Sequence, residues 1–184
     1  MRKLIYGINL TADGCCDHTK VNGSIAIHNY FTNLMNDVDL IVYGRITYEL
    51  MVPYWPDVAK SRTGQQSELD FADKFNAIHK VVFSRTLETA GENTTIIRDN
   101  VEEEILKLKQ LPGKNISIGG VDFPSQLIAL GLIDEFYFVV HPSFAGVGRR
   151  LLDNTGIEAP FKDLVLMDTE VLGSGYVALH YRKP

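Results

Sequence analysis

The sequence predicts a three-layer α/β domain with a mostly parallel sheet and a C-terminal antiparallel hairpin. Short apolar runs typical of buried strands alternate along the chain with segments of helical periodicity, which favours parallel strands joined by helices. The last two strand-like segments, 164–172 and 176–182, instead follow each other directly across Gly173-Ser174-Gly175, as in a hairpin. No repeat or linker divides the 184 residues, so we expect one domain over residues 1–184.

The N-terminal segment predicts a strand, a long loop and a helix. Residues 3–10 alternate and then run apolar, which suits a first, central strand. A polar loop continues to Gly23, and loops of this length are often functional. Ser24 is placed to cap a helix with one apolar face. That face is formed by Ile27, Tyr30, Phe31, Leu34 and Met35.

The next stretch passes from a buried strand directly into a helix. Residues 40–43 form a short apolar run rich in β-formers, which indicates a strand buried on both faces. After Gly44 the apolar residues fall at helical spacing. Pro53, Trp55 and Pro56 are expected to end this helix.

The remaining segments continue the alternation. Asn100 is expected to cap a helix over 101–111, whose first turn holds three glutamates where the helix dipole favours them. The other expected helices are 68–77 and a segment through Leu127 to Gly131, and the other expected strands are 79–84, 94–98, 115–118 and 134–141.

Composition and charge exclude several classes of protein. With 45% apolar and 22% charged residues, the chain has the composition of a soluble globular protein. No apolar run approaches the roughly 20 residues that span a bilayer, and the N-terminus lacks a signal-peptide pattern, so we expect a cytoplasmic protein without a membrane partner. The net charge of −5 argues against a nucleic-acid surface, which requires a basic patch.

The cysteines and histidines predict no metal site. Cys15 and Cys16 are adjacent, with Cα atoms about 3.8 Å apart, so a disulfide between them would be strained. We therefore expect reduced thiols. No spacing of Cys and His matches a zinc site.

Three expected strand ends carry chemistry that suits phosphate groups: Gly44-Arg45-Ile46-Thr47, Ser84-Arg85-Thr86 and Gly119-Gly120. A strand that enters a helix through glycine presents free backbone N–H groups and the positive end of a dipole. An ordinary turn with a solvent-facing arginine explains the first of them equally well. In open α/β sheets, however, ligands bind beyond the carboxyl ends of the strands, so the three together favour an extended phosphorylated cofactor. No G-x-G-x-x-G motif follows the first strand.

These motifs resemble the dihydrofolate reductase-like superfamily. Within it the chain is similar to the C-terminal reductase domain of the bifunctional riboflavin biosynthesis deaminase-reductase, over nearly the whole length. The resemblance rests on Asp13-Gly14, residues 39–49, Ser84-Arg85, residues 118–120, residues 132–136 and residues 148–152. It implies a three-layer α/β/α dihydrofolate reductase-like fold. The zinc signature of the deaminase half is absent, so only the reductase domain is expected.

The resemblance also implies that the protein binds NADPH. Arg85 is a suitable bidentate partner for phosphate, or else part of a surface salt bridge. Two adjacent glycines let the backbone approach a diphosphate closely, or else form a tight helix–strand junction. By family analogy the phosphates would be contacted by Gly44, Arg45 and Thr47, the 2′-phosphate end by Ser84 and Arg85, and the pyrophosphate by Gly119, Gly120 and Val121.

Catalysis by hydride transfer further requires a proton source. Folate-reducing relatives carry a carboxylate on the helix before the Gly-Arg motif, where this chain has His28 or Asn29 and no Asp or Glu. Asp13 is the first candidate because it begins the loop that would border the nicotinamide, and His28 is the second. Tyr48 and Trp55 are candidates to flank the substrate, although aromatic residues at helical spacing more often belong to the core.

Together these features predict an NADPH-dependent oxidoreductase that acts on a C=N or C=O group of a small heterocycle. The resemblance makes it most like the 5-amino-6-(5-phosphoribosylamino)uracil reductase of riboflavin biosynthesis. A catalytically silent NADP(H)-binding protein and a dihydrofolate or pterin reductase are the alternatives. We also expect a homodimer, in which the edge of the terminal hairpin, including Val177, Leu179 and Tyr181, is covered by a second copy.

Overall fold

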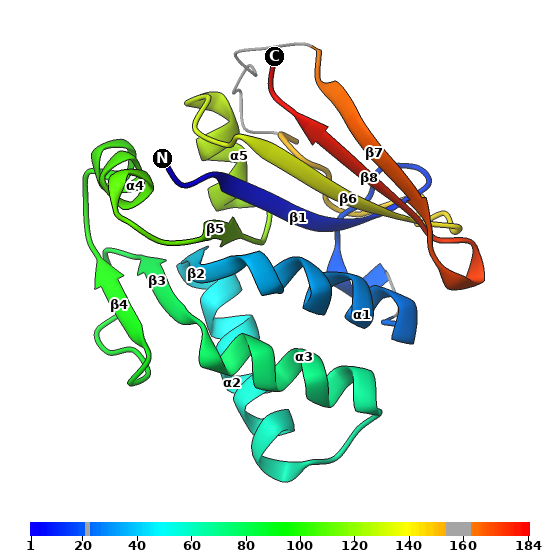
Figure 1. Cartoon of the computed structure of the whole chain (residues 1–184), viewed down its shortest axis with the longest axis horizontal. Helices are drawn as coiled ribbons and strands as arrows, with labels where there is room; N and C mark the ends of the chain where they lie inside the picture. Colours follow the sequence, from blue (N-terminus) through cyan, green and yellow to red (C-terminus); the bar gives the residue numbers. More distant parts are fainter. Residues whose placement is uncertain (21–22, 154–162) are drawn as a thin grey trace.

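The computed structural model describes residues 1–20, 23–153 and 163–184. In this part of the chain one sheet of eight strands has the order β4-β3-β2-β5-β1-β6-β8-β7 (Figure 1). The strands β1 to β6 are parallel, whereas β8 runs antiparallel to both β6 and β7. Their bounds are β1 Leu4–Thr11, β2 Val38–Gly44, β3 His79–Phe83, β4 Thr94–Ile97, β5 Asn115–Ile118, β6 Glu135–His141, β7 Val165–Val171 and β8 Val177–Arg182.

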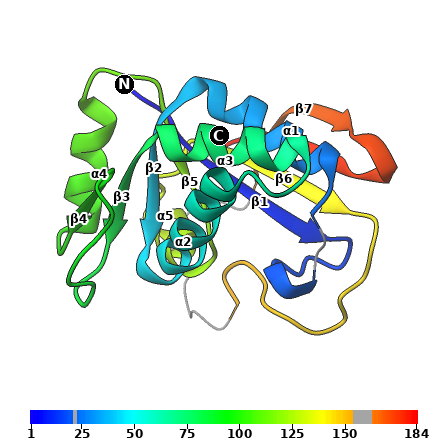
Figure 2. The ribbon, with the colours of Figure 1, turned by 90° about the horizontal axis from the view of Figure 1, so that it is seen from below.

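Helices cover both faces of the sheet, as Figures 1 and 2 show. On one face lie α1 (Ile25–Leu34), α2 (Arg45–Ser61) and α3 (Gln66–Ala77), and on the other α4 (Val101–Gln110) and α5 (Asp122–Ala129). Trp55 of α2 and Phe75 of α3 are buried in the core on the first face, and Ile105 of α4 and Leu127 of α5 are buried in the core on the second. The short 3-10 turns are η1 (His18–Lys20), η2 (Met35–Asp37) and η3 (Gly173–Gly175). This arrangement confirms the predicted three-layer fold with its antiparallel hairpin.

Local chemistry explains why several elements lie where the sequence predicted. Ser24 caps α1, because its side chain accepts a hydrogen bond of 3.2 Å from the backbone N–H of Ile27. The first strand, β1, is central as expected, between β5 and β6.

Cys15 and Cys16 are free and buried. Among the described residues no cluster of His, Cys, Asp and Glu could hold a metal ion.

The predicted end of the second helix is wrong. We expected Pro53, Trp55 and Pro56 to stop it, but α2 continues through both prolines to Ser61. Proline removes one backbone hydrogen bond inside a helix, yet burial of an amphipathic face can outweigh that loss. Trp55 is only 8% exposed and packs into the core, which holds the central part of α2 in place.

Two finer expectations also need correction. Asn100 precedes α4 but makes no side-chain capping bond; its backbone is left-handed (φ 56°), a conformation that asparagine tolerates. Val177, Leu179 and Tyr181 do not lie at the sheet edge, because their strand β8 is paired on both sides. The edge strand on this side of the sheet is β7, which is exposed along its whole length.

No helix in the described ranges combines the length and the apolar character that crossing a bilayer would require.

Candidate functional site

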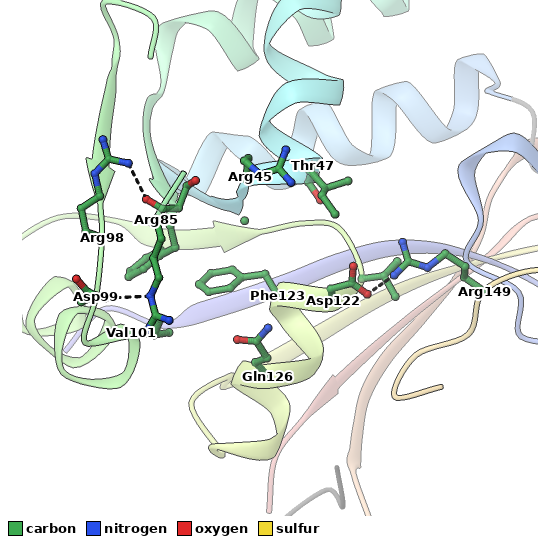
Figure 3. Close-up of a pocket in the computed structure, with 15 residues that line it drawn as sticks. Arg45, Thr47, Arg85, Arg98, Asp99, Val101, Asp122, Phe123, Gln126 and Arg149 are labelled. Carbon is green, nitrogen blue, oxygen red and sulfur yellow. Dashed lines mark hydrogen bonds and ion pairs between the residues drawn. The ribbon is translucent and has the colours of Figure 1, made fainter. Parts of the chain in front are cut away.

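The carboxyl ends of β2, β3 and β4 and the start of α5 meet along one groove. The groove encloses about 410 Å³. Its described lining includes four arginines against two aspartates, so it is electropositive in an otherwise acidic protein. The arginines are Arg45, Arg85, Arg98 and Arg149. Figure 3 shows them spread along the groove, with Arg85 and Arg98 at one end, Arg149 at the other and Phe123 between. Such a surface suits a polyanion.

The Arg85 end of the groove is built by the β3 and β4 termini. The guanidinium of Arg85 is 81% exposed and donates to Asp99 at 3.0 Å. Arg98 donates to the carbonyl oxygen of Ser84 at 3.0 Å, which fixes the two strand ends together. The buried Ser84 hydroxyl accepts from the backbone N–H of Leu87 at 2.9 Å. Because exposed ion pairs contribute little, Arg85 can exchange Asp99 for a phosphate at small cost.

The middle of the groove is a strand-to-helix turn with unusually close packing. Gly44 is the N-cap of α2. No side chain forms a capping hydrogen bond with this helix, and its first turn contains no acidic residue. Its backbone N–H groups are therefore available to an anion. A Cβ at Gly44 would lie 2.8 Å from Cβ of Phe123, so α5 can pack this closely only against glycine.

A second glycine, Gly120, adjoins this turn from β5. Its φ of +95° strongly favours glycine, and a Cβ there would overlap the hydroxyl of Thr47. Its carbonyl oxygen accepts a hydrogen bond of 2.7 Å from the hydroxyl of the buried Tyr6. The β5–α5 and β2–α2 junctions are thus in direct contact through Gly120 and Thr47.

An inner cavity of about 380 Å³ opens beside this junction, between the sheet and the helices α1, α2 and α3. It shares Ile46, Thr47, Val121 and Arg149 with the groove, so the two spaces adjoin. Its walls are largely apolar, with aromatic side chains on both the helices and the sheet: Phe31, Tyr43, Trp55, Phe71 and Phe75. Its volume lies within the range of roughly 300–1,000 Å³ that is typical of small-molecule sites.

The two candidate proton donors lie in different places. His28 lines the inner cavity and packs edge-on against Trp55, with ring centroids 5.9 Å apart. Burial lowers the pKa of His28, so its imidazole is neutral at pH 7. Its Nδ1 is buried and finds no hydrogen-bond partner among the described residues.

Asp13 is not among the described residues that line either space. Its carboxylate accepts from the Thr11 hydroxyl and from the backbone N–H groups of Ala145 (3.0 Å) and Gly146 (2.8 Å). These hydrogen bonds lower the pKa of Asp13 to about 2, and the one from Thr11 has the largest effect. The ionised carboxylate joins the loop after β1 to the loop after β6, and at neutral pH it has no proton to give.

Asp13→Asn is therefore expected to destabilise the fold at pH 7. A carboxyl whose pKa is lowered on folding adds stability above its unfolded pKa of about 3.9 and loses it as the pH falls towards the folded value. The difference in unfolding free energy between the wild type and Asp13→Asn should thus shrink from pH 7 to pH 3, measured by urea denaturation. Asp57→Asn, on the exposed surface of α2, serves as the control for the loss of one surface charge. A constant difference for Asp13→Asn would contradict the assigned contacts.

The structure brings together the residues expected to contact cofactor. The groove is lined by Gly44, Arg45, Thr47, Ser84, Arg85 and Val121, and the inner cavity by Thr47, Gly119, Gly120 and Val121. Their contact with NADPH stays a prediction. Trp55 lines the inner cavity, whereas Tyr48 does not and accepts a hydrogen bond from Gly91.

Arg98, Phe123 and the position of Arg149 in the groove were not predicted from the sequence. Arg98 directly follows the end of β4, and Arg85 lies just after the end of β3. This repeated placement of arginine after a strand could have predicted that Arg98 belongs to the groove.

Comparison with known proteins identifies the family. The family model of the RibD C-terminal domain matches residues 2–178. The uncharacterized protein YyaP of Bacillus subtilis (strain 168) is 31% identical over 98% of this chain and 94% of its own length.

Solved structures share the fold at lower identity. A protein from Shewanella sp. PV-4 that is named for riboflavin biosynthesis superposes with a TM-score of 0.71, at 18% identity over 99% of both chains. Dihydrofolate reductase from Enterococcus faecalis, in complex with NADP(H), has a TM-score of 0.61 at 13% identity over 98% of this chain and 95% of that one. The fold is therefore dihydrofolate reductase-like. Since the family model covers almost the whole sequence, the chain belongs to the family of the RibD C-terminal domain.

Proposed function

We propose that the protein is an NADPH-dependent reductase that transfers hydride to a C=N or C=O group of a small ring compound. The observation that carries this proposal is the junction of two unlike spaces. An arginine-rich groove adjoins an aromatic cavity at Thr47 and Val121. A dinucleotide has the same asymmetry, with phosphates along its length and a flat nicotinamide ring at one end.

The residues of the groove fit a phosphorylated dinucleotide. Arg85 and Arg98 are the cations nearest the β3 and β4 ends, where a 2′-phosphate would bind. The uncapped start of α2 and the glycine pair before α5 offer backbone N–H groups to the diphosphate. The reductase from Enterococcus faecalis is complexed with NADP(H) on the same fold, which supports a dinucleotide of this kind as the cofactor.

The inner cavity would exclude water and orient the substrate. When bound, NADPH supplies the hydride, and the apolar walls keep the reacting atoms dry and close together. Reduction also consumes one proton. His28 is better situated than Asp13 to relay this proton from solvent, because the His28 ring lines the cavity, whereas Asp13 lines neither described space.

Binding of NADPH and NADH by the purified protein tests the cofactor assignment. We expect NADPH to bind at least about tenfold more tightly than NADH, since only NADPH carries the 2′-phosphate. Equal affinities, or no binding of either, would remove the basis of the proposal.

A panel of pterins, pyrimidines and simple carbonyl compounds then separates an active enzyme from a silent cofactor-binding protein. Substrate-dependent oxidation of NADPH that is lost in His28→Gln supports the enzyme. NADPH binding without turnover of any compound favours the silent alternative.

We also propose that the protein forms a homodimer through β7. This edge strand exposes Val165, Leu166, Met167 and Val171, of which Val171 is 79% exposed. An exposed apolar edge strand is stabilised when a second chain covers it. Light scattering is expected to give the mass of two chains, and the mass of one chain would contradict the proposal.

A further inference from the structure

The inner cavity presents almost no charge to a bound molecule. Within the described ranges its lining contains no Asp, Glu or Lys, and Arg149 is the one arginine. A cationic substrate beside the nicotinamide would find no carboxylate partner in the described lining, and it would face the positive charge that the nicotinamide ring carries in NADP⁺. A buried carboxylate or phosphate would depend on Arg149 alone.

Arg149 lies at the mouth of the cavity, where its half-exposed side chain is shared with the groove. Its guanidinium forms an ion pair with Asp122 at the start of α5, and it lies where the cavity meets the groove (Figure 3). The neighbouring Arg150 does not line the cavity, and its Nε donates to the carbonyl oxygen of Asp13. An anion held among the aromatic walls would therefore have no cation of its own in the described lining, because the one arginine is shared with the groove, where the phosphates of the cofactor would compete for it.

Burial keeps the other titratable side chains of the cavity neutral. It raises the pKa of the Cys16 thiol to about 11 and raises that of the Tyr43 phenol above its usual value. It lowers the pKa of His28 and of His141. The Nε2 of His141 also lies 3.2 Å from Oδ1 of Asn9, so these two polar groups satisfy each other.

The walls favour a flat occupant. The Trp55 and Phe71 rings pack with centroids 4.4 Å apart, and Phe71 continues in a near-parallel stack onto Phe75 (14°, 6.2 Å). Aromatic faces of this kind hold planar rings by offset stacking and edge contacts. His28 adds one neutral polar group beside them.

We propose that the substrate is a flat, uncharged ring compound that carries no carboxylate or phosphate. The inference deepens the proposed function, because it names the substrate class of the same cavity. It separates this protein from a reductase of phosphoribosyl pyrimidines, whose substrate carries a dianion.

The single tryptophan makes the cavity directly observable. Trp55 is the only tryptophan of the chain, so its fluorescence reports binding at the cavity wall. With NADP⁺ at saturation, which binds without turnover, four naphthalene-sized probes can be titrated: 2-naphthaldehyde, 2-naphthoate, 2-naphthyl phosphate and the cation N-methylquinolinium. We expect the aldehyde to quench Trp55 and to bind at least about tenfold more tightly than each charged probe.

The outcomes separate this inference from the proposed function. If NADP⁺ does not bind, the proposed function fails. If NADP⁺ binds but a charged probe matches or exceeds the aldehyde, or the aldehyde does not bind, the substrate assignment is overturned.

A charge variant tests the cause of the selectivity. Leu50 lines the cavity and is 46% exposed, so Leu50→Arg adds a cation there with little risk to folding. It should tighten 2-naphthoate binding severalfold and leave the aldehyde within about twofold, with Leu50→Gln as the uncharged control. If Leu50→Arg left 2-naphthoate binding unchanged, the lack of a countercharge would not be the cause of the selectivity.

Discussion

Arg85→Ala is expected to weaken NADPH binding by about 10- to 100-fold and to leave NADH binding nearly unchanged. Arg85 is 81% exposed at the end of the groove, and its exposed partner Asp99 holds it only weakly. A phosphate on the cofactor can form two parallel charge-assisted bonds with its guanidinium. Only NADPH carries that group, so the loss should be specific to NADPH. Calorimetric titration with both cofactors measures it.

The matched control is Arg62→Ala. Arg62 also makes an exposed ion pair, with Asp73, but lies at the end of α2 outside both described spaces. It should leave both affinities unchanged. Equal weakening of NADPH and NADH in Arg85→Ala would mean that Arg85 does not contact the 2′-phosphate.

Gly120→Ala is expected to lower the free energy of unfolding by about 3 kcal/mol or more and to abolish tight NADPH binding. Two effects add at this position. The backbone is left-handed with φ +95°, and the new methyl group would overlap the Thr47 hydroxyl. Relief of that overlap must move the β5–α5 junction away from the β2–α2 turn, which separates the two halves of the site. Chemical denaturation and NADPH titration of the same variant measure both losses.

Gly146→Ala separates conformational strain from the steric overlap. Gly146 also has a positive φ, +72°, but nothing lies within 4 Å of a Cβ built there. Its substitution should cost only the left-handed conformation, about 1 kcal/mol, and leave NADPH binding intact. If Gly120→Ala bound NADPH as well as Gly146→Ala does, the proposed role of the junction would be wrong.

The parts of the fold that local sequence determines were predictable. The β2–α2 turn is one example, because a buried apolar run, a glycine and helical spacing follow one another within a few residues. The course of α2 through Pro53 and Pro56 was not, since the burial of Trp55 that stabilises it involves α3 and the sheet. The edge position of β7 likewise depends on pairing between segments far apart in sequence.

The residues of the candidate site likewise fall into those that the sequence could predict and those that depend on contacts between distant segments. Gly44, Ser84 and Gly119 could be grouped in advance, because parallel strands bring their carboxyl ends to one side of a sheet. Arg149 could not, since its place between groove and cavity depends on the loop after β6 and on Asp122 of α5. For Asp13, the sequence could not show that Thr11, Ala145 and Gly146 surround its carboxylate.

A crystal structure of the protein with NADP⁺ tests the joint use of groove and cavity most directly. We expect the 2′-phosphate within hydrogen-bond distance of Arg85, the diphosphate on the backbone N–H groups of the Gly44–Thr47 turn, and the nicotinamide in the inner cavity. A 2′-phosphate remote from Arg85, with the nicotinamide outside the inner cavity, would contradict it.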